Sequence, residues 1–324
     1  MVRRKRARTV CRVSVLLLRT KGKETMRGLE KRFLYNGEHP VTFFGFGALE
    51  IGRNWGLGSG AEVERPDPAA AGVVLNKVLD LGITLVDTAS AYHQSEARIG
   101  QSIAARRADY VLASKCGEHS DGDRTYYDFS YEAIAGSIDR SLELLQTDCL
   151  DLLQIHFGPE PGKVLDEGAT VAAMKDARAA GKTRLLGASI GGEVAARCIE
   201  SGDFDVMQLG YSLLNRSDGP LIERCAQRGM GVLIRGGLGA GRLTQRVVPH
   251  LQEMKESERG RIEQLLELVD GDAEKLTALA LQFLYANPGV TSVLVGSKRG
   301  EHIEANLPLL DIDLGDALAR ALEL

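Results

Sequence analysis

From about residue 31 onward, short runs of apolar residues alternate with longer stretches in which apolar positions recur at helical spacing. Eight of the runs are nearly all apolar, as expected for parallel strands that are buried on both faces. They lie at residues 41–45, 83–86, 110–114, 150–155, 183–187, 206–209, 231–234 and 292–295. The pattern therefore predicts eight strands of a parallel sheet.

The stretches between these runs predict helices, and several of them carry residues that favour a helix end. Ser130 stands where its hydroxyl can cap a first helical turn, and Gly82 and Gly181 follow the last turn of two other helices. The predicted helices lie at residues 69–81, 95–106, 131–145, 168–180, 192–201, 219–228, 272–286 and 301–307.

Strands that alternate with helices, without a break in composition, favour an α/β fold with one closed (β/α)8 TIM barrel over residues 31–324. Residues 31–44 are predicted to form an N-terminal β-hairpin that closes the barrel floor. Residues 245–270 are a charged insertion on the catalytic side, which we interpret as a lid or specificity loop. The alternative, a doubly wound open sheet, usually carries G-x-G-x-x-G after its first strand, and here the third glycine is missing after Gly45-Phe46-Gly47.

Charge is distributed unevenly along the chain. The formal net charge is -4, but residues 1–25 hold nine basic residues against Glu24 alone, so this segment carries +8 and the remainder carries -12. We interpret residues 1–25 as a basic, disordered extension, and favour a start at Met26 over a targeting peptide or a nucleic-acid tether. The acidic body argues against nucleic-acid binding, because counterion release needs a basic face.

The cysteines and the apolar stretches bear on the compartment. The five cysteines are widely spaced and form no C-x-x-C pair, which argues against a disulfide framework or a zinc site. The apolar stretch at residues 13–18 is too short for a membrane span. We therefore expect a cytoplasmic protein without a membrane or nucleic-acid partner, as a monomer or a small homo-oligomer.

Three consecutive predicted strands each end at a titratable side chain: Asp87, Lys115 and His156. Tyr92 follows Asp87 by five residues. The C-terminal ends of barrel strands share one rim, where the active sites of such barrels lie. Taken singly, each residue has an ordinary explanation as a turn residue, a surface charge or packing. Their conjunction on neighbouring strand ends predicts a catalytic centre.

The four side chains suit the reduction of a carbonyl group without a metal. Tyr92 can give a proton to the carbonyl oxygen if its pKa falls from about 10 toward neutrality, and the ammonium of Lys115 favours that fall. Asp87 can hold the ammonium in place. His156 can hydrogen-bond the substrate oxygen and stabilise developing charge.

The ordered motifs resemble those of the aldo-keto reductase superfamily from about Phe43 to Leu307. The segment from Gly82 to Tyr92, GITLVDTASAY, is similar to the family's G-[IV]-x-x-[FI]-D-T-A-x-x-Y. The segment DCLDLLQIH, which ends at His156, is similar to its D-Y-[IV]-D-L-[YL]-Q-[IL]-H. Lys115, Gly187-Ala188-Ser189 and Gln208 match further motifs in order.

This resemblance implies an oxidoreductase that binds NADP(H) in an extended pose on the barrel. It implies that Ser189 and Gln208 contact the nicotinamide carboxamide, and that the loop after the seventh strand runs under the nicotinamide and pyrophosphate. The cofactor-binding residues it implies are Gly47, Ala48, Ser189, Gln208, Arg235, Gly236, Leu238, Gly241, Ser297, Lys298, His302 and Asn306.

Several positions depart from the family's pattern. His93 replaces the usual glycine after the tyrosine, and Ile190 replaces the asparagine that commonly follows the serine. Arg235 stands where an aromatic residue often stacks on the nicotinamide, and a guanidinium can also stack. His302 stands where an arginine often binds the 2′-phosphate, and Lys298 with Arg299 can bind that phosphate instead. NADP(H) is therefore favoured over NAD(H).

The main hypothesis is the reversible reduction of an aldehyde or ketone by NAD(P)H, with a small-molecule carbonyl or alcohol as substrate. One alternative is a cofactor-binding regulatory or interaction protein without activity. Another is an NAD-dependent dehydrogenase of sugars or pyridoxal-type substrates. Aromatic residues of the rim loops are candidates for the substrate pocket, namely Trp55, Tyr126, Tyr127 and Tyr211.

Overall fold

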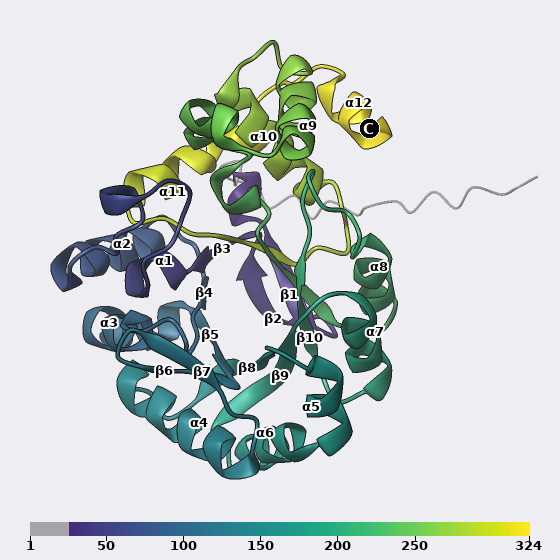
Figure 1. The fold of residues 1–324 in the computed structure, drawn as a ribbon. Coiled ribbons are helices and arrows are strands. Elements are labelled where there is room, and N and C mark those ends of the chain that lie inside the picture. Colours follow the sequence, from purple (N-terminus) through teal and green to yellow (C-terminus); the bar gives the residue numbers. More distant parts are fainter. Residues whose placement is uncertain (1–25) are drawn as a thin grey trace, which may run out of the picture.

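Eight parallel strands close into a barrel in the computed structural model, which describes residues 26–324. Each strand pairs with the next along the chain, and the last pairs with the first. The predicted (β/α)8 fold is confirmed (Figure 1). The barrel strands are β3 (Phe44–Gly47), β4 (Leu85–Asp87), β5 (Val111–Cys116), β8 (Leu150–His156), β9 (Thr183–Ser189), β10 (Val206–Gly210), β11 (Gly231–Arg235) and β12 (Ser292–Val295). The expectation for residues 1–25 lies outside the described residues.

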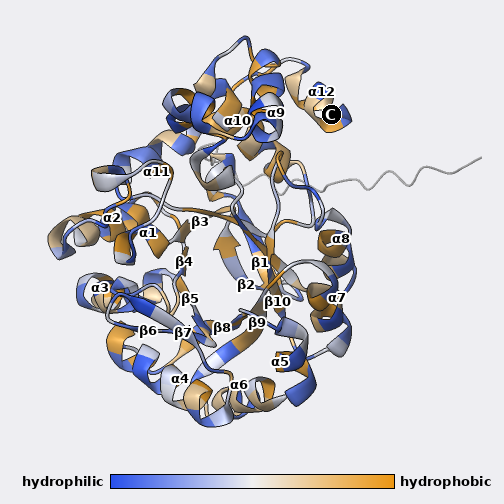
Figure 2. Cartoon of the chain, viewed as in Figure 1, coloured by the Kyte–Doolittle hydropathy of each residue, from blue (hydrophilic) through white to orange (hydrophobic). Residues whose placement is uncertain are grey.

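Helices surround the barrel, and Figure 2 shows that they carry both hydrophobic and hydrophilic positions. In α4, Ser130 Oγ accepts a hydrogen bond from Ala133 N, and Ile134, Ile138 and Leu145 are buried. The helices that follow barrel strands are α2 (Pro68–Asp80), α3 (Ser95–Ile103), α4 (Tyr131–Leu145), α6 (Ala169–Ala179), α7 (Gly192–Ser201), α8 (Gly219–Gln227), α10 (Ala273–Tyr285) and α11 (Gly300–Asn306).

A hairpin of β1 (Lys31–Tyr35) and β2 (Glu38–Thr42) covers the barrel floor. Its Leu34 and Val41 are fully buried in one cluster with residues near the strand starts, such as Leu85 and Leu152. The predicted first strand at 41–45 was wrong in its boundaries, because residues 38–42 belong to the hairpin and the barrel strand begins at Phe44. The apolar run continues through both elements, so hydropathy alone does not mark the junction.

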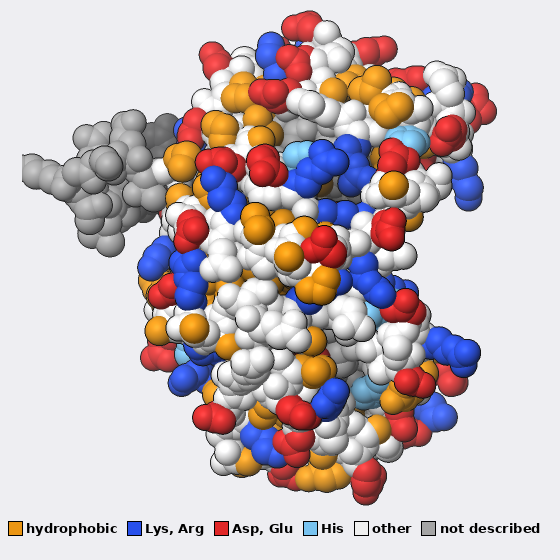
Figure 3. All heavy atoms as spheres, turned by 90° about the vertical axis from the view of Figure 1, so that its left-hand side faces the viewer, with side chains coloured by type: hydrophobic (Ala, Val, Ile, Leu, Met, Phe, Trp, Pro, Cys, Tyr) orange, Lys and Arg blue, Asp and Glu red, His pale blue; other side chains and the backbone are white. Residues whose placement is uncertain are grey.

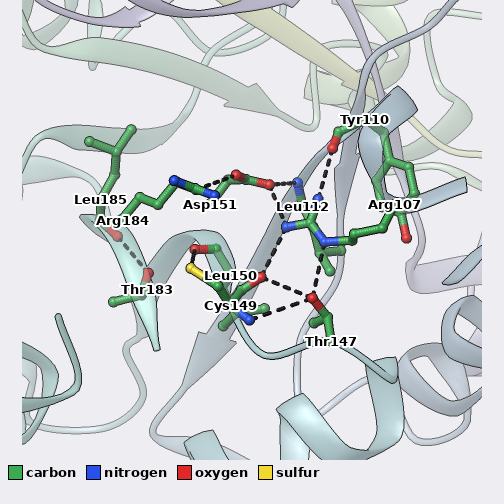
Figure 4. A network of polar contacts seen from close by, with 10 residues as sticks. All are labelled: Arg107, Tyr110, Leu112, Thr147, Cys149, Leu150, Asp151, Thr183, Arg184 and Leu185. Carbon is green, nitrogen blue, oxygen red and sulfur yellow. Dashed lines mark hydrogen bonds and ion pairs between the residues drawn. The ribbon is translucent and has the colours of Figure 1, made fainter. Parts of the chain in front are cut away.

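The floor end also carries a polar network at the starts of β5, β8 and β9 (Figure 4). Asp151 accepts hydrogen bonds from Leu112 N at 2.8 Å, from Arg107 Nη2 at 2.6 Å and from Arg184 Nε at 3.1 Å. One carboxylate therefore joins three neighbouring strand starts on the side of the barrel opposite the predicted site.

Several elements were not predicted, all of them outside the barrel alternation. A second hairpin, β6 (Glu118–Asp121) with β7 (Arg124–Tyr127), follows β5 on the rim.

The predicted lid is helical, with the 3-10 helix η5 (Gln245–Glu253) and the helix α9 (Glu256–Glu267). The predicted helix at 95–106 ends at Ile103, where a 3-10 turn begins. The remaining α-helices of the described residues are α1 (Leu49–Gly52), α5 (Pro161–Glu167) and α12 (Ala317–Glu323). Within residues 26–324, no helix has the length and apolarity that crossing a bilayer requires.

Candidate active site

Asp87 and Lys115 form a buried ion pair at the C-terminal ends of β4 and β5. Lys115 Nζ lies 2.5 Å from Asp87 Oδ2 and donates to Thr88 O at 2.8 Å. Lys115 is 1% exposed and Asp87 is 2% exposed. A buried charge of this kind is tolerated because it is paired and hydrogen-bonded. The pair therefore fixes the ammonium at one point of the rim.

Tyr92 brings its hydroxyl to this ammonium, since its oxygen lies 3.3 Å from Lys115 Nζ. The backbone around it is held closely, because a Cβ on Gly52 would lie 2.2 Å from Tyr92 O. His156, the last residue of β8, meets the Tyr92 ring edge-on with the ring centroids 5.8 Å apart. The structure thus brings all four residues of the predicted centre together.

Burial decides the acidity of Tyr92. Burial raises the pKa of the Tyr92 phenol above its usual value, and the nearby Lys115 charge offsets only part of that rise. The expectation that the pKa of Tyr92 falls toward neutrality was therefore wrong for this structure. Burial alone would lower the pKa of Lys115, but Asp87 and Tyr92 raise it overall. Tyr92 holds its proton beside a fully charged ammonium.

Two glutamines orient Asp87, and only one of them was predicted as a site residue. Gln154 Nε2 donates to Asp87 Oδ1 at 2.9 Å, and Gln208 Nε2 donates to the same oxygen at 3.0 Å. Gln154 lies two residues before His156 on β8, so it points to the same side of the strand. This two-residue spacing is the signal in the sequence that indicates Gln154.

Glu118, which begins β6, is a second residue that sequence reasoning missed. Its Oε2 lies 2.9 Å from His156 Nδ1, and its Oε1 lies 3.6 Å from Arg53 Nη1. Burial alone would raise the pKa of Glu118, but His156 and Arg53 lower it overall. Burial lowers the pKa of His156, although Glu118 acts in the opposite direction. At neutral pH the pair is a carboxylate beside a neutral imidazole.

The residues implied for the nicotinamide end lie around the same rim. Ser189 ends β9, and its Oγ donates to Gln208 Oε1 at 3.1 Å. Gly47 ends β3 opposite Asp87, and Ala48 N donates to Asp87 O at 2.8 Å. These four positions therefore border the Asp87–Lys115 pair from both sides of the barrel.

Arg235 ends β11, and its exposed guanidinium lies over Gly210 at the end of β10. A cleft of about 570 Å³ opens here, lined by Gly191, Gly210 and Arg235 among others. Beyond Arg235 the chain turns through Gly236, Leu238 and Gly241, with φ of +66° at Gly236 and +95° at Gly241. A Cβ at Gly236 would meet nothing within 4 Å, so the backbone there is open to a ligand.

A cationic cluster lies beyond the end of β12 and is formed by Arg246, Lys298, Arg299 and His302. Ser297 Oγ contacts His302 Nδ1 at 3.3 Å. Burial lowers the pKa of His302, and the nearby Arg299 and Arg246 charges lower it further. Arg246 comes from η5 and was not predicted. Asn306 lies one turn after His302 at the end of α11. The face with α2 and α11 shows lysine and arginine side chains gathered together (Figure 3).

The rim residues fit a nicotinamide dinucleotide. The open glycine turn suits close backbone approach to a pyrophosphate, and the cationic cluster suits a further phosphate. The buried amide of Gln208 donates to Asp87 of the ion pair, and the hydroxyl of Ser189 hydrogen-bonds that amide. An acid beside a fixed cation suits proton transfer to an oxygen that gains charge, and the His156 ring lies beside the acid.

Comparisons with known proteins point to one family. A model of the aldo/keto reductase family matches residues 44–323. L-galactose dehydrogenase of Arabidopsis thaliana is 31% identical over 298 residues, 87% of this chain and 88% of that protein. NADH-specific methylglyoxal reductase of Escherichia coli is 27% identical, over 73% of this chain and 81% of that protein. Among solved structures, the holo form of aldo-keto reductase AKR11C1 from Bacillus halodurans has a TM-score of 0.76 at 26% identity, covering 91% of this chain and 95% of its own.

Proposed function

This chain belongs to the aldo/keto reductase family, and on that premise we propose that four clustered side chains catalyse the reversible reduction of an aldehyde or ketone: Asp87, Tyr92, Lys115 and His156. The chain is accordingly a nicotinamide-dependent oxidoreductase that acts on small carbonyl or alcohol substrates. The enzymes among its relatives favour this function over the regulatory alternative.

The reduction places a hydride on the carbonyl carbon and a proton on the carbonyl oxygen. The nicotinamide supplies the hydride when it is bound. Hydride addition turns the carbonyl oxygen into an alkoxide, a stronger base than a phenolate, so Tyr92 gives it a proton despite the raised pKa of the phenol. Lys115 stabilises the phenolate that remains. In the reverse direction the phenolate takes the proton of the alcohol. The observation that carries this proposal is the Tyr92 hydroxyl 3.3 Å from a buried ammonium.

The test is the oxidation of NADPH in the presence of a panel of aldehydes and ketones. We expect Tyr92→Phe to lower kcat by about 10²- to 10⁴-fold, because a positioned acid contributes about that much. Tyr131→Phe is the matched control, since Tyr131 lies on the outer helix α4 and hydrogen-bonds Asp176. Equal turnover by wild type and Tyr92→Phe would remove Tyr92 from this role.

We further propose that NADP(H) is preferred over NAD(H), because Arg246, Lys298 and Arg299 offer cations to a 2′-phosphate. Glu50 lies near Lys298 and Arg246, and burial raises the pKa of its carboxyl while these two charges lower it. The loop from Trp55 to Val63 is tied to the same cluster, since Lys298 Nζ donates to Glu62 O at 2.7 Å.

Calorimetric titration with NADPH and NADH checks this preference. The double variant Arg246→Ala/Lys298→Ala is expected to weaken NADPH binding by roughly a hundredfold or more, since charge-assisted contacts contribute about 1.5–3 kcal/mol each. NADH binding is expected to change little. Arg228→Ala, which breaks an ion pair with Glu200 far from the cluster, is the matched control. Equal losses for both cofactors would contradict the assignment.

A second candidate is the oxidation of a sugar with NAD, favoured by the 31% identity to L-galactose dehydrogenase over most of both chains. The same titration distinguishes the two, because tighter binding of NADH than NADPH supports this candidate. An aldose panel with NAD then measures the oxidation directly.

A further inference from the structure

Glu118 is a buried carboxylate that the reduction as described does not use. Its side chain is 9% exposed, against 21% for His156 and 29% for Arg53. Its backbone is anchored at the site, because Ser90 Oγ donates both to Glu118 O at 2.7 Å and to Lys115 O at 3.0 Å. The carboxylate is therefore held beside the catalytic ion pair by the backbone of the rim.

The contact between Glu118 and His156 constrains where the imidazole carries its proton. Glu118 Oε2 lies 2.9 Å from Nδ1, at an angle outside regular hydrogen-bond geometry. At this distance the negative oxygen still repels a lone pair on Nδ1 and attracts an N–H there, even without linear alignment. The electrostatics favour the tautomer with the proton on Nδ1.

We propose that Glu118 is a positioning residue that keeps the proton of neutral His156 on Nδ1, so that Nε2 is an acceptor in the neutral ring and a donor only in the imidazolium. This inference rests on the proposed function, because it assigns a protonation state to the ring that contacts the substrate oxygen.

The consequence differs for the two directions of the reaction. A carbonyl oxygen only accepts hydrogen bonds, so His156 assists reduction as the imidazolium, whose charge Glu118 balances. An alcohol hydroxyl can donate, so the neutral ring suits the start of oxidation. His156 transfers no proton in either direction, because that proton moves between Tyr92 and the substrate oxygen.

The charged and titratable groups around the pair come from every neighbouring element. Lys115, Asp87 and Tyr92 act on His156 from the other side of the site, and Lys115 opposes its protonation. Arg53, Tyr127 and His93 lie around Glu118. Of these, Glu118 is the group whose contact with Nδ1 selects between the two neutral tautomers.

The nitrogen-15 shifts of the histidine rings in the full chain test the inference without any turnover. The protein is labelled in histidine, and the His156 signals are identified by their loss in His156→Asn. In wild type we expect a protonated Nδ1 and an unprotonated Nε2 at pH 8. In Glu118→Gln we expect the Nε2-protonated form to appear, because the amide can donate to Nδ1. Glu118→Asp keeps the charge and is expected to restore the wild-type pattern.

The pH dependence of carbonyl reduction supplies the second readout. The imidazolium exists below the pKa of His156, so kcat/KM of reduction is expected to fall as pH rises through that pKa. Loss of the Glu118 charge lowers the pKa, so the fall in Glu118→Gln begins at lower pH. At a pH above the transition, kcat/KM of Glu118→Gln is expected to be roughly tenfold below that of wild type. This is the change that follows when loss of a neighbouring charge lowers the pKa of His156 by about one unit.

Glu132→Gln, an exposed change in the first turn of α4, is the control and should alter neither readout. A wild-type ring protonated on Nε2, or an unchanged tautomer in Glu118→Gln, overturns the inference even if the enzyme is active. The expected tautomers in a protein that reduces no carbonyl would instead count against the proposed function. If circular dichroism shows that Glu118→Gln does not fold, the nitrogen-15 shifts of His156 in wild type and in Glu118→Asp still test which ring nitrogen carries the proton.

Discussion

Gln154 shows how one amide can matter for activity more than for stability. Its Nε2 donates to Asp87 at 2.9 Å, but its Oε1 is buried without a hydrogen-bond partner. An apolar replacement loses the bond to the carboxylate and also removes a buried, unpaired oxygen. These two effects oppose each other in the free energy of unfolding.

We therefore expect Gln154→Leu to change the free energy of unfolding by under about 1 kcal/mol, and to lower kcat by about tenfold because Asp87 loses one of its two orienting amides. Urea unfolding and steady-state kinetics measure the two quantities on the same preparation. A large loss of stability with unchanged kcat would contradict this account.

The residues of the proposed catalytic centre could be predicted where they lie at the C-terminal end of a strand. Asp87, Lys115 and His156 have positions that follow from strand boundaries alone. Glu118 and Arg53 could not be predicted, because their contacts depend on how the β6–β7 hairpin and the segment after α1 fold over the rim. The acidity of Tyr92 was misjudged because burial, which a sequence pattern does not measure, outweighs the nearby ammonium.

The polar network at the strand starts allows the stability of the barrel floor to be tested separately from the site at the rim. Asp151 joins β5, β8 and β9 through Leu112 N, Arg107 and Arg184 (Figure 4). Asp151→Asn removes the charge of this mostly buried carboxylate. We expect a loss of about 1–3 kcal/mol in the free energy of unfolding, because bonds to a charged group are weakened.

Asp151→Asn is expected to keep wild-type activity at temperatures where it is folded. In such barrels, residues at the N-terminal face contribute to stability and the active site lies at the opposite face. Asp139→Asn is the control, because its pair with Lys182 is largely exposed and contributes at most about 1 kcal/mol. Chemical denaturation and kcat are measured for both. Equal losses of stability would show that the network is no stronger than a surface pair.

The elements of the barrel were predicted well because their apolar runs are continuous and their spacing is regular. The hairpin β6–β7 was missed because its strands, such as Arg124–Tyr127, are polar and lie outside the barrel. The junction between β2 and β3 was misplaced for the opposite reason, since both sides of it are apolar and buried.

Across the whole molecule, two distant segments meet beside the cationic cluster. Arg246 Nη2 in η5 donates to Leu57 O at 2.8 Å, and a Cβ at Gly241 would lie 3.5 Å from Leu57. The loop they contact carries Trp55, which is 46% exposed and is the single tryptophan of the sequence.

Cofactor binding is therefore expected to change the fluorescence of Trp55, because a phosphate that attracts Arg246 or Lys298 competes with the loop carbonyls these cations hold. Titration of the full chain with NADPH measures the emission change. Trp55→Phe should abolish the signal while calorimetry still detects binding. An emission spectrum that does not respond at saturating NADPH would contradict this view of the loop.

Asp87 accepts hydrogen bonds from Lys115, Gln154 and Gln208. Because three donors share one acceptor, the cost of each mutation at this site depends on which residue is replaced first. Replacing Asp87 first leaves a buried ammonium and two amides without their acceptor. Replacing Lys115 first leaves a buried carboxylate that still accepts hydrogen bonds from both amides, so this loss costs less. A lineage that loses catalytic activity is thus expected to replace the lysine before the aspartate. The effects of mutations at these positions are expected to be non-additive.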